Sequence, residues 1–307
     1  MSDGGKRLRI GTRGSLLART QTGMVVEQLR AANPDVEIET HIIQTTGDVQ
    51  RSVPFAQVGT KGMFVKEIEQ ALLDGSIDVG VHSLKDMPSE LPEGLELACV
   101  PAREDPLDAL LARTGLSFAL LPLNAVVGTS SLRRKAQLRA LRPDLRVQEL
   151  RGNLDTRMKR LDDGEYDAIL LAVAGLNRLG LGSRITERLT PDVCVPAAGQ
   201  GALALETRCG DRKTVALLHT VHDPLTAAAV TAERAFLAAL GGGCSIPAGA
   251  LATIQGDRLH IVGLIAAPNG AKVVRAEREG DVSAAAQIGA ELSATLLAQG
   301  GRELLKG

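Results

Sequence analysis

Aromatic residues are scarce in this sequence of 307 residues, which has no Trp, one Tyr and four Phe. Proteins that bind single-stranded nucleic acid stack the bases on aromatic rings, so this scarcity disfavours that function. The chain also lacks an excess of positive charge, because 35 Lys and Arg are set against 36 Asp and Glu. A globally basic nucleic-acid binder is therefore disfavoured as well, and no nucleic acid is predicted as a partner.

Cysteine is also scarce, and its spacing argues against two kinds of site. The four cysteines are Cys99, Cys194, Cys209 and Cys244, and none forms a CxxC pair or has a His or Cys neighbour at zinc-ligand spacing. We therefore expect neither a disulfide framework nor a metal site. Long apolar runs are missing too: the N-terminus has no signal-peptide core, and no segment approaches the roughly 18 residues of a membrane span. A cytoplasmic protein that makes no contact with membranes is expected.

A repeated strand–turn–helix pattern fills the first two thirds of the chain. At roughly 150 residues per domain, the length predicts about two domains, with three small ones as the alternative. Strands that alternate with helices predict the α/β class, with a mainly parallel, doubly wound sheet in each of two domains. In such sheets ligands bind beyond the carboxyl ends of the strands. The expected strands lie near residues 8–10, 36–44, 77–81, 125–127, 146–150 and 168–173.

Two stretches, at 101–106 and 195–201, are predicted to cross between two lobes. After about residue 221 the pattern changes. Asp223-Pro224 resembles an N-cap followed by Pro at the first helical position, and alternating strands follow at 246–254, 258–266 and 271–277, closed by a helix at 282–299. We expect domain 1 at residues 1–101 with 201–220, domain 2 at 102–200, and a smaller α+β domain with an antiparallel sheet at 221–307.

Positive charge is concentrated in one window and is mostly arginine. Residues 133–160 hold eight Arg and two Lys against three acidic residues, which leaves this window at +7 in a chain of net charge −1. Guanidinium binds carboxylate or phosphate in a two-pronged planar geometry that Lys cannot match. The alternative is a solvated, Arg-rich helix face.

Four turns after expected strands favour the ligand-binding interpretation. In VGTSSLRRK, hydroxyl residues cap a helix whose first turn holds Arg133 and Arg134. Cations there are unfavourable by a few tenths to about 1 kcal/mol each, so an anionic ligand is predicted to compensate; the alternative is that both point to solvent. The turns IGTRGS, LRGNLDTR and AGLNRLG repeat the design. Together they predict a site for a ligand with several separated carboxylates or phosphates, whereas no P-loop or GxGxxG motif is present.

Two further residues stand out. Asp86 follows an expected strand in VHSLKDMP, where it is either the ion-pair partner of Lys85 or a carboxylate that stabilises a cation during a reaction. Cys244 follows three glycines in GGGCSIP, which leave the sulfur open to a large group, so covalent attachment is one interpretation and a small buried residue the other. For Cys99, Cys194 and Cys209 the small buried apolar interpretation is preferred.

These motifs together resemble hydroxymethylbilane synthase (porphobilinogen deaminase) over nearly the whole chain and in collinear order. The resemblance implies an enzyme, a transferase of tetrapyrrole (porphyrin and heme) biosynthesis that joins four porphobilinogen molecules head to tail, releases ammonia each time and hydrolyses off linear hydroxymethylbilane. It also implies a cytoplasmic monomer with two domains like a periplasmic binding protein and a third domain. The segments that carry the resemblance are GTRGSLLA, TTGD, GTKGMFVKEIEQALL, DVGVHSLKDMP, REDPLDA, VGTSSLRRKAQL, LRGNLDTR, EYDAILLAVAGLNRLGL, PAAGQGAL and TAERAFLAALGGGCSIP.

The same resemblance implies roles for individual residues. A dipyrromethane cofactor would be attached to Cys244 by a thioether, and Asp86 would be the catalytic aspartate facing the pyrrole nitrogens. The residues that match cofactor contacts are Cys244, Ser83, Lys85, Asp86, Thr129, Ser131, Arg133 and Arg134. Those that match substrate contacts are Arg13, Ser15, Phe64, Arg151, Arg157 and Arg178, and residues 45–62 match a mobile loop.

Two positions depart from the family pattern. Gly241 stands where the family usually has Glu before GGC, which would loosen the cysteine loop, and Gln57 stands where many relatives have a basic residue. Two other functions remain open from the residues alone. One is a two-lobed binding protein for an anionic metabolite without chemistry. The other, a cysteine-nucleophile hydrolase, lacks a recognisable His partner.

Overall fold

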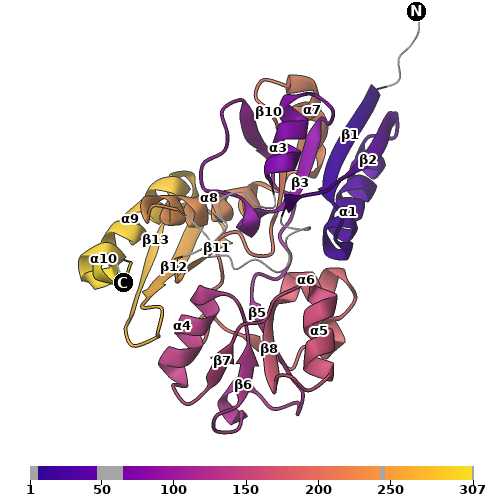
Figure 1. Ribbon diagram of the computed structural model, residues 1–307. Coiled ribbons are helices and arrows are strands. Elements are labelled where there is room, and N and C mark those ends of the chain that lie inside the picture. Colours follow the sequence, from indigo (N-terminus) through magenta and orange to yellow (C-terminus); the bar gives the residue numbers. More distant parts are fainter. Residues whose placement is uncertain (1–5, 47–64, 243–245, 306–307) are drawn as a thin grey trace, which may run out of the picture. The chain divides into compact units, whose positions relative to one another are not determined.

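The computed structural model describes residues 6–46, 65–242 and 246–305 (Figure 1). The chain divides into two compact units, of which the first comprises Met1–Arg103 with Ala202–Ala227 and the second Glu104–Gly201 with Ala228–Gly307. The second unit therefore holds both the expected domain 2 and most of the expected domain 3. The division into three domains stays a prediction.

The first unit is built on a five-stranded mixed sheet in the order β2-β1-β3-β10-β4. β1, β2 and β3 are parallel, whereas β10 is antiparallel to both of its neighbours. Its strands are β1 (Lys6–Arg13), β2 (Val36–Ile43), β3 (Val79–Ser83), β4 (Leu95–Cys99) and β10 (Leu203–Arg208). Its helices are α1 (Leu16–Ala32), α3 (Lys66–Leu73) and α7 (Arg212–Leu218).

Helices cover both faces of this sheet, as a doubly wound fold requires (Figure 1). Val25 and Leu29 of α1 pack with Leu8, Ile10 and other apolar residues on one face. On the other face, α3 contributes a separate cluster with the residues around Ile77 and Leu95. Successive side chains of a strand point to opposite faces of the sheet, so the strands contribute apolar residues to both clusters.

The second unit contains a similar sheet in the order β7-β6-β8-β5-β9, with β5 as the reversed strand. Leu138 of α4 lies in the apolar cluster of one face, and Met158 of α5 lies in that of the other. The strands are β5 (Asp108–Ala112), β6 (Val126–Gly128), β7 (Arg146–Gln148), β8 (Ala168–Ala172) and β9 (Glu187–Leu189). The helices are α4 (Leu132–Leu141), α5 (Leu154–Asp162) and α6 (Val173–Arg178).

The C-terminal part of the second unit is a three-stranded antiparallel sheet in the order β11-β12-β13. One face packs on Phe236 of α8 and Leu292 of α9, and the other on Ala136 and Val195. Asp223 caps α8, whose first residue is Pro224, as predicted: its Oδ1 accepts a hydrogen bond from Thr226 N at 2.6 Å. The elements are α8 (Pro224–Ala239), β11 (Ala248–Gln255), β12 (Arg258–Ala266), β13 (Val273–Asp281), α9 (Ala285–Leu296), a π-helical turn (Leu297–Gly301) and α10 (Arg302–Leu304).

The predicted α/β class, with two doubly wound sheets and a smaller antiparallel C-terminal sheet, is confirmed. The reversed strands were not predicted. β5 and β10 are the first strands after the chain passes from one unit to the other, at 103–104 and 201–202. An apolar strand pattern carries no direction, so the reversal leaves no trace in the sequence.

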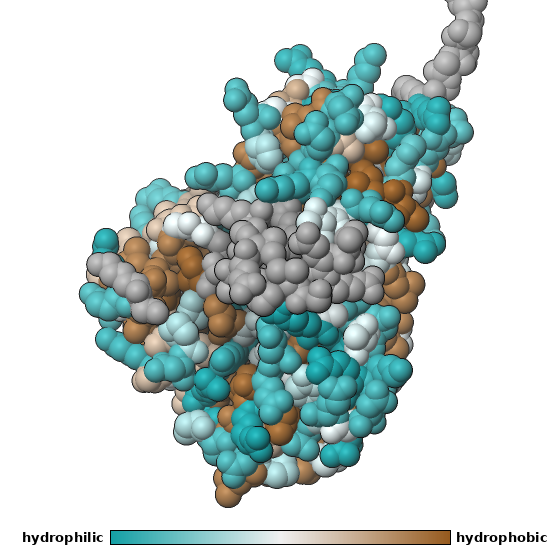
Figure 2. Space-filling view, viewed as in Figure 1, coloured by the Kyte–Doolittle hydropathy of each residue, from teal (hydrophilic) through white to brown (hydrophobic). Residues whose placement is uncertain are grey.

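Hydrophilic residues cover most of the described surface on the face shown in Figure 2. Among the described residues, every helix is too short or too polar to cross a membrane.

Candidate active site

The predicted residues of the first unit lie at the ends of β1 and β3. Arg13 is the last residue of β1, and Ser15 caps α1, where its side chain accepts a hydrogen bond from Ala18 N at 3.3 Å. Ser83 ends β3, and its hydroxyl donates to Gln21 Oε1 of α1 at 3.1 Å. Because β1 and β3 are parallel neighbours, their carboxyl ends share one edge of the sheet.

Lys85 and Asp86 lie on a single 3-10 turn, η1 (Leu84–Asp86), directly after β3. Leu84 and Met87 are buried and anchor the turn, and Leu84 N donates to Ala202 O at 3.0 Å. The side chain of Asp86 is half-buried and makes no hydrogen bond or ion pair with any other described residue. Its carboxylate is therefore not committed to the described parts of the fold, as a catalytic carboxylate requires.

Sequence analysis missed a buried charged cluster behind the same strand. His82 Nε2 lies 3.0 Å from Glu206 Oε2, and both side chains are almost fully buried. The contact lacks hydrogen-bond geometry, and neither carboxylate oxygen of Glu206 has a hydrogen-bond partner among the described residues. Glu69 of α3 is buried nearby, and burial, together with the charge of Glu206, raises the pKa of its carboxyl. No local signal in VHS or LETR pointed to this pairing, which depends on the register of β3 and β10.

In the second unit, the turn between β6 and α4 holds Thr129 and Ser131 as predicted. Thr129 N donates to Gln148 O at 2.9 Å, and its Oγ1 accepts from Ser131 N at 3.2 Å. Ser131 is the N-cap of α4 and accepts from Arg134 N at 3.4 Å. Hydrogen bonds to its own hydroxyls and to Gln148 of β7 therefore hold the turn in place at the start of α4.

Arg133 and Arg134 do not point to solvent but into the second unit, toward Asp108, the first residue of β5. Asp108 is 0% exposed, and the two arginines are 4% and 6% exposed. Arg133 Nη1 donates to Asp108 Oδ2 at 2.6 Å, and Arg134 donates to Oδ1 from Nε at 2.9 Å and from Nη2 at 2.7 Å. Burial alone would raise the pKa of Asp108, but the two guanidinium groups hold it far below its usual range.

This geometry corrects the reason given for the two arginines. The compensating anion of the described structure is a carboxylate of the protein itself, 25 residues earlier in the sequence. The alternative of two solvent-facing arginines is wrong. Two guanidinium groups share one carboxylate, so the cluster keeps a net charge of +1.

Cys194 and Gln200 complete this cluster. Cys194 Sγ donates to Asp108 Oδ2 at 3.2 Å and accepts from Arg133 Nη1 at 3.3 Å. Burial, and next the charge of Asp108, raises the pKa of its thiol to about 12. Gln200 Nε2 donates to Asp108 Oδ1 at 3.0 Å. Cys194 is buried as predicted, but its contacts are polar rather than only apolar. Cys99 is also buried as predicted, whereas Cys209 is exposed, so the prediction is wrong for Cys209.

The remaining arginines lie after the neighbouring strands of this sheet. Arg151 follows β7 and pairs with Glu149 at 2.5 Å. Arg157, one turn into α5, donates from Nε to Gly152 O at 2.7 Å. Asn153 is the N-cap of α5 as predicted, although its side chain makes no capping hydrogen bond.

Arg178, at the end of α6 after β8, donates from Nη2 to Gly201 O at 2.7 Å. Its Nε is buried and has no hydrogen-bond partner among the described residues. Burial lowers the pKa of this guanidinium, and it makes no ion pair with a described carboxylate. A half-buried cation whose Nε lacks an acceptor is stabilised by an added anion.

β7, β6 and β8 are parallel neighbours, so the predicted residues of the second unit gather at one edge of its sheet. The residues predicted for the first unit gather in the same way at the edge formed by β1 and β3. Two predicted site residues, Phe64 and Cys244, lie outside the described residues, as does most of the predicted loop at 45–62.

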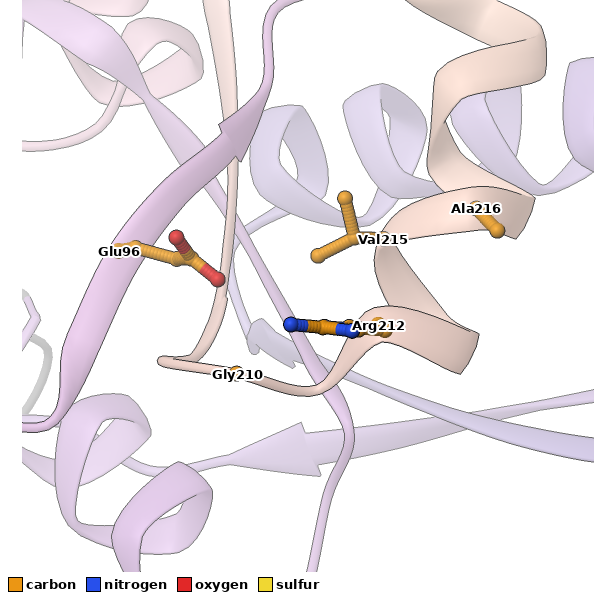
Figure 3. Close-up of a pocket in the computed structure, with 5 residues that line it drawn as sticks. All are labelled: Glu96, Gly210, Arg212, Val215 and Ala216. Carbon is orange, nitrogen blue, oxygen red and sulfur yellow. The ribbon is translucent and has the colours of Figure 1, made fainter.

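A pocket of about 370 Å³ in the first unit is not part of this arrangement (Figure 3). Glu96 of β4 and Arg212 of α7 face each other across it. None of the predicted site residues lines it; the lining residues are Glu96, Gly210, Arg212, Val215 and Ala216.

The fold and these strand ends define a class: an α/β protein with two mixed sheets whose parallel strands are followed by arginines and hydroxyl residues. Comparison with known proteins then gives the family. The family model described as "Porphobilinogen deaminase, dipyromethane cofactor binding domain" matches residues 8–216, and that of the "Porphobilinogen deaminase, C-terminal domain" matches residues 227–298. The chain belongs to the porphobilinogen deaminase family, and the predicted family and enzyme class, a transferase, are confirmed.

Curated relatives match over their whole length. A porphobilinogen deaminase of Roseiflexus castenholzii is 52% identical over 98% of this chain and 99% of the relative. Those of Deinococcus radiodurans and Thermus thermophilus are 50% and 51% identical, over 98% and 96% of this chain and 98% and 97% of the relatives. Among solved structures, a YaeC-family lipoprotein from Enterococcus faecalis has a TM-score of 0.43 at 14% identity and covers 71% of this chain and 92% of its own.

Proposed function

We propose that this chain is a hydroxymethylbilane synthase that joins four porphobilinogen molecules head to tail. Each condensation releases one ammonia, and hydrolysis then frees the linear product. Membership of the porphobilinogen deaminase family supports this reaction. So does the chemistry of the strand ends, because each pyrrole of the substrate carries an acetate and a propionate.

The structural observation that supports the proposal most strongly is the environment of the Arg178 side chain. Its guanidinium is buried at Nε, lacks an ion pair among the described residues, and has its pKa lowered by burial. The charge of Glu104 offsets only part of the effect of burial, and a carboxylate of the substrate would stabilise this guanidinium further by accepting a hydrogen bond from it. A second cation without full compensation lies in the same unit, since Asp108 serves both Arg133 and Arg134.

The donor set also fits a dipyrromethane, which carries four carboxylates. We assign its carboxylates to the hydroxyl, ammonium and guanidinium groups of Ser83, Lys85, Thr129, Ser131, Arg133 and Arg134, and its covalent thioether to Cys244. When bound, this group would supply the free pyrrole α-carbon to which the first substrate unit is joined, and each later unit would be joined to the pyrrole added before it. The substrate's own carboxylates and ring are assigned to Arg13, Ser15, Phe64, Arg151, Arg157 and Arg178.

The role proposed for Asp86 is electrostatic. Loss of ammonia breaks the aminomethyl C–N bond of porphobilinogen, the electron pair leaves with nitrogen, and an azafulvenium cation remains. Arginines that bind the carboxylates oppose such a cation, so one fixed negative charge facing the pyrrole nitrogens lowers the barrier. Asp86 supports this role because its half-buried carboxylate is held on a one-turn helix and has no partner among the described residues.

The cellular setting is part of the proposal. The family resemblance and the absence of cysteine pairs in the sequence support a cytoplasmic enzyme, and the resemblance also supports a monomer with no nucleic-acid or membrane partner. Size-exclusion chromatography with light scattering tests the monomer, which predicts a mass near 32.2 kDa.

The reaction itself is tested by its stoichiometry. The purified protein is incubated with porphobilinogen, and ammonia and hydroxymethylbilane are both quantified. Four ammonia molecules per product are expected. Binding of porphobilinogen without ammonia release would instead establish the alternative, a binding protein for an anionic metabolite.

A further inference from the structure

A buried polar cluster of the second unit centres on Asp108, a residue without an assigned part in the reaction. Its two carboxylate oxygens accept hydrogen bonds from Arg133, Arg134, Gln200 and Cys194. The residue lies on β5 and is completely buried. A contact with substrate is therefore excluded for Asp108 itself, and any part that it plays acts through its neighbours.

The two arginines are held in place but are not saturated by this cluster. A guanidinium has five N–H donors. The hydrogen bonds that Arg133 donates to described residues come from Nη1 and Nη2 and none from Nε, and each Nη of Arg134 donates to one described acceptor. Donors therefore remain on both side chains, and with one carboxylate for two cations, a positive charge remains as well.

The cluster is also joined to the strand that follows Cys244 in the chain. Arg133 Nη1 donates to Val195 O at 2.7 Å, and Pro196 O accepts from Ala250 N of β11 at 3.0 Å. A Cβ added to Gly249 of β11 would meet Pro196 O at 2.6 Å and Arg133 Cδ at 3.1 Å. Hydrogen bonds and close packing thus connect Asp108, through Arg133, to the start of β11.

We propose that Asp108 is a positioning residue for loading of the dipyrromethane: its carboxylate fixes Arg133 and Arg134 in the geometry in which they receive carboxylates of the ligand, next to the strand that follows Cys244. This inference rests on the proposed function. Without Asp108 the two guanidinium groups would be flexible. Binding of each ligand carboxylate would then have to order them, which weakens the binding.

The test compares four proteins: wild type, Asp108→Asn, Arg134→Gln and the double variant Asp108→Asn/Arg134→Gln. The last removes one buried cation together with the carboxylate, so it keeps the balance of charge and folds even where Asp108→Asn does not. Each purified apoprotein is incubated with rising concentrations of porphobilinogen, and the loaded fraction is read by intact mass. Thermal unfolding is recorded beside it, with Leu110→Ala as a control that opens a cavity in the same strand.

We expect Asp108→Asn to need at least 10-fold more porphobilinogen for half-loading than wild type, and the double variant to need at least 10-fold more than Arg134→Gln. Leu110→Ala should unfold earlier yet load like wild type. If the double variant loads as readily as Arg134→Gln, or if Leu110→Ala loads as poorly as Asp108→Asn at equal stability, Asp108 is only structural and the inference is wrong. Failure of wild type to gain mass would instead refute the proposed function.

Discussion

Asp108 Oδ1 accepts two hydrogen bonds from one guanidinium, that of Arg134, from Nε at 2.9 Å and from Nη2 at 2.7 Å. Arg134 lies in the first turn of α4, where a cation is opposed by the helix dipole. The fully buried carboxylate of Asp108 on β5 offsets that penalty. The pair thereby links α4 to β5, which is the first strand of the second unit.

The first prediction concerns the stability that this buried carboxylate provides. Asp108→Asn leaves two buried guanidinium groups without a counter-charge, and we expect the free energy of unfolding to fall by about 3–5 kcal/mol. Asp144 forms an ion pair with Arg142 at 2.7 Å near the surface. Asp144→Asn breaks this pair and should lower the free energy of unfolding much less. Urea unfolding of both variants checks this, and equal losses would contradict it.

The second prediction concerns Glu69, whose pKa is raised by burial and by Glu206. A carboxyl whose folded-state pKa is raised favours folding below its unfolded pKa of about 4.3, and that contribution is lost as the pH rises through the folded-state pKa. Glu69→Gln is neutral throughout, so it should be more stable than wild type at neutral pH, with the gain shrinking toward pH 4.

Glu67 on the same helix provides a control of opposite sign. Burial opposes its charge, but hydrogen bonds from Thr46 lower the pKa of its carboxyl, so its stabilising contribution is present above the unfolded pKa and is lost in acid. Glu67→Gln should therefore lose stability at neutral pH. Urea midpoints from pH 4 to pH 8 separate the two, and parallel curves for both variants would refute the assignment.

The third prediction concerns Gly249, which lies against the backbone of Val195 and Pro196. Its added Cβ would meet Pro196 O at 2.6 Å and Val195 O at 2.7 Å, and backbone cannot move aside cheaply. Gly249→Ala should cost about 1–3 kcal/mol in unfolding free energy. Gly23→Ala in α1, where nothing lies within 4 Å, should be neutral or slightly stabilising. A neutral Gly249→Ala would mean that β11 is not fixed by this contact.

The fourth prediction concerns Asp86. Asp86→Asn keeps the size of the side chain and removes its charge, so porphobilinogen should still bind while turnover falls on the order of 10²-fold or more. Asp86→Glu keeps the charge about one methylene away and should lose less. Single-turnover kinetics on loaded enzyme measure the chemical step directly. A near-normal rate for Asp86→Asn would leave another group to stabilise the cation.

The sequence predicts the elements of this fold well where a single strand or helix carries its own signal. The apolar run at 168–173 and the Ser131 cap each state their structure locally. The same holds for the strand ends, since any residue that directly follows a parallel strand is placed at the ligand-binding edge. Arg151 was predicted in that way, and Arg157 and Arg178 were predicted from the helices that follow β7 and β8. Their part in ligand binding stays a prediction.

Pairings between distant strands could not be found from the sequence. Asp108 belongs to REDPLDA, just after the stretch at 101–106 that is predicted to cross between lobes, and nothing in that segment shows that it would meet two arginines of α4. His82 and Glu206 meet because β10 runs antiparallel to β3, and both strands are almost entirely buried. Charges at such positions are recognised only once the direction and the register of the strands are known.

The central claim, a covalent dipyrromethane on Cys244 that primes condensation, is tested most directly by intact mass spectrometry of the purified full-length protein. The account predicts a mass above that of the sequence by one dipyrromethane, its complete loss in Cys244→Ala, and further steps of one pyrrole unit each when porphobilinogen is added to wild type. Active wild-type enzyme at the bare mass of its sequence, or an excess that survives in Cys244→Ala, would contradict it.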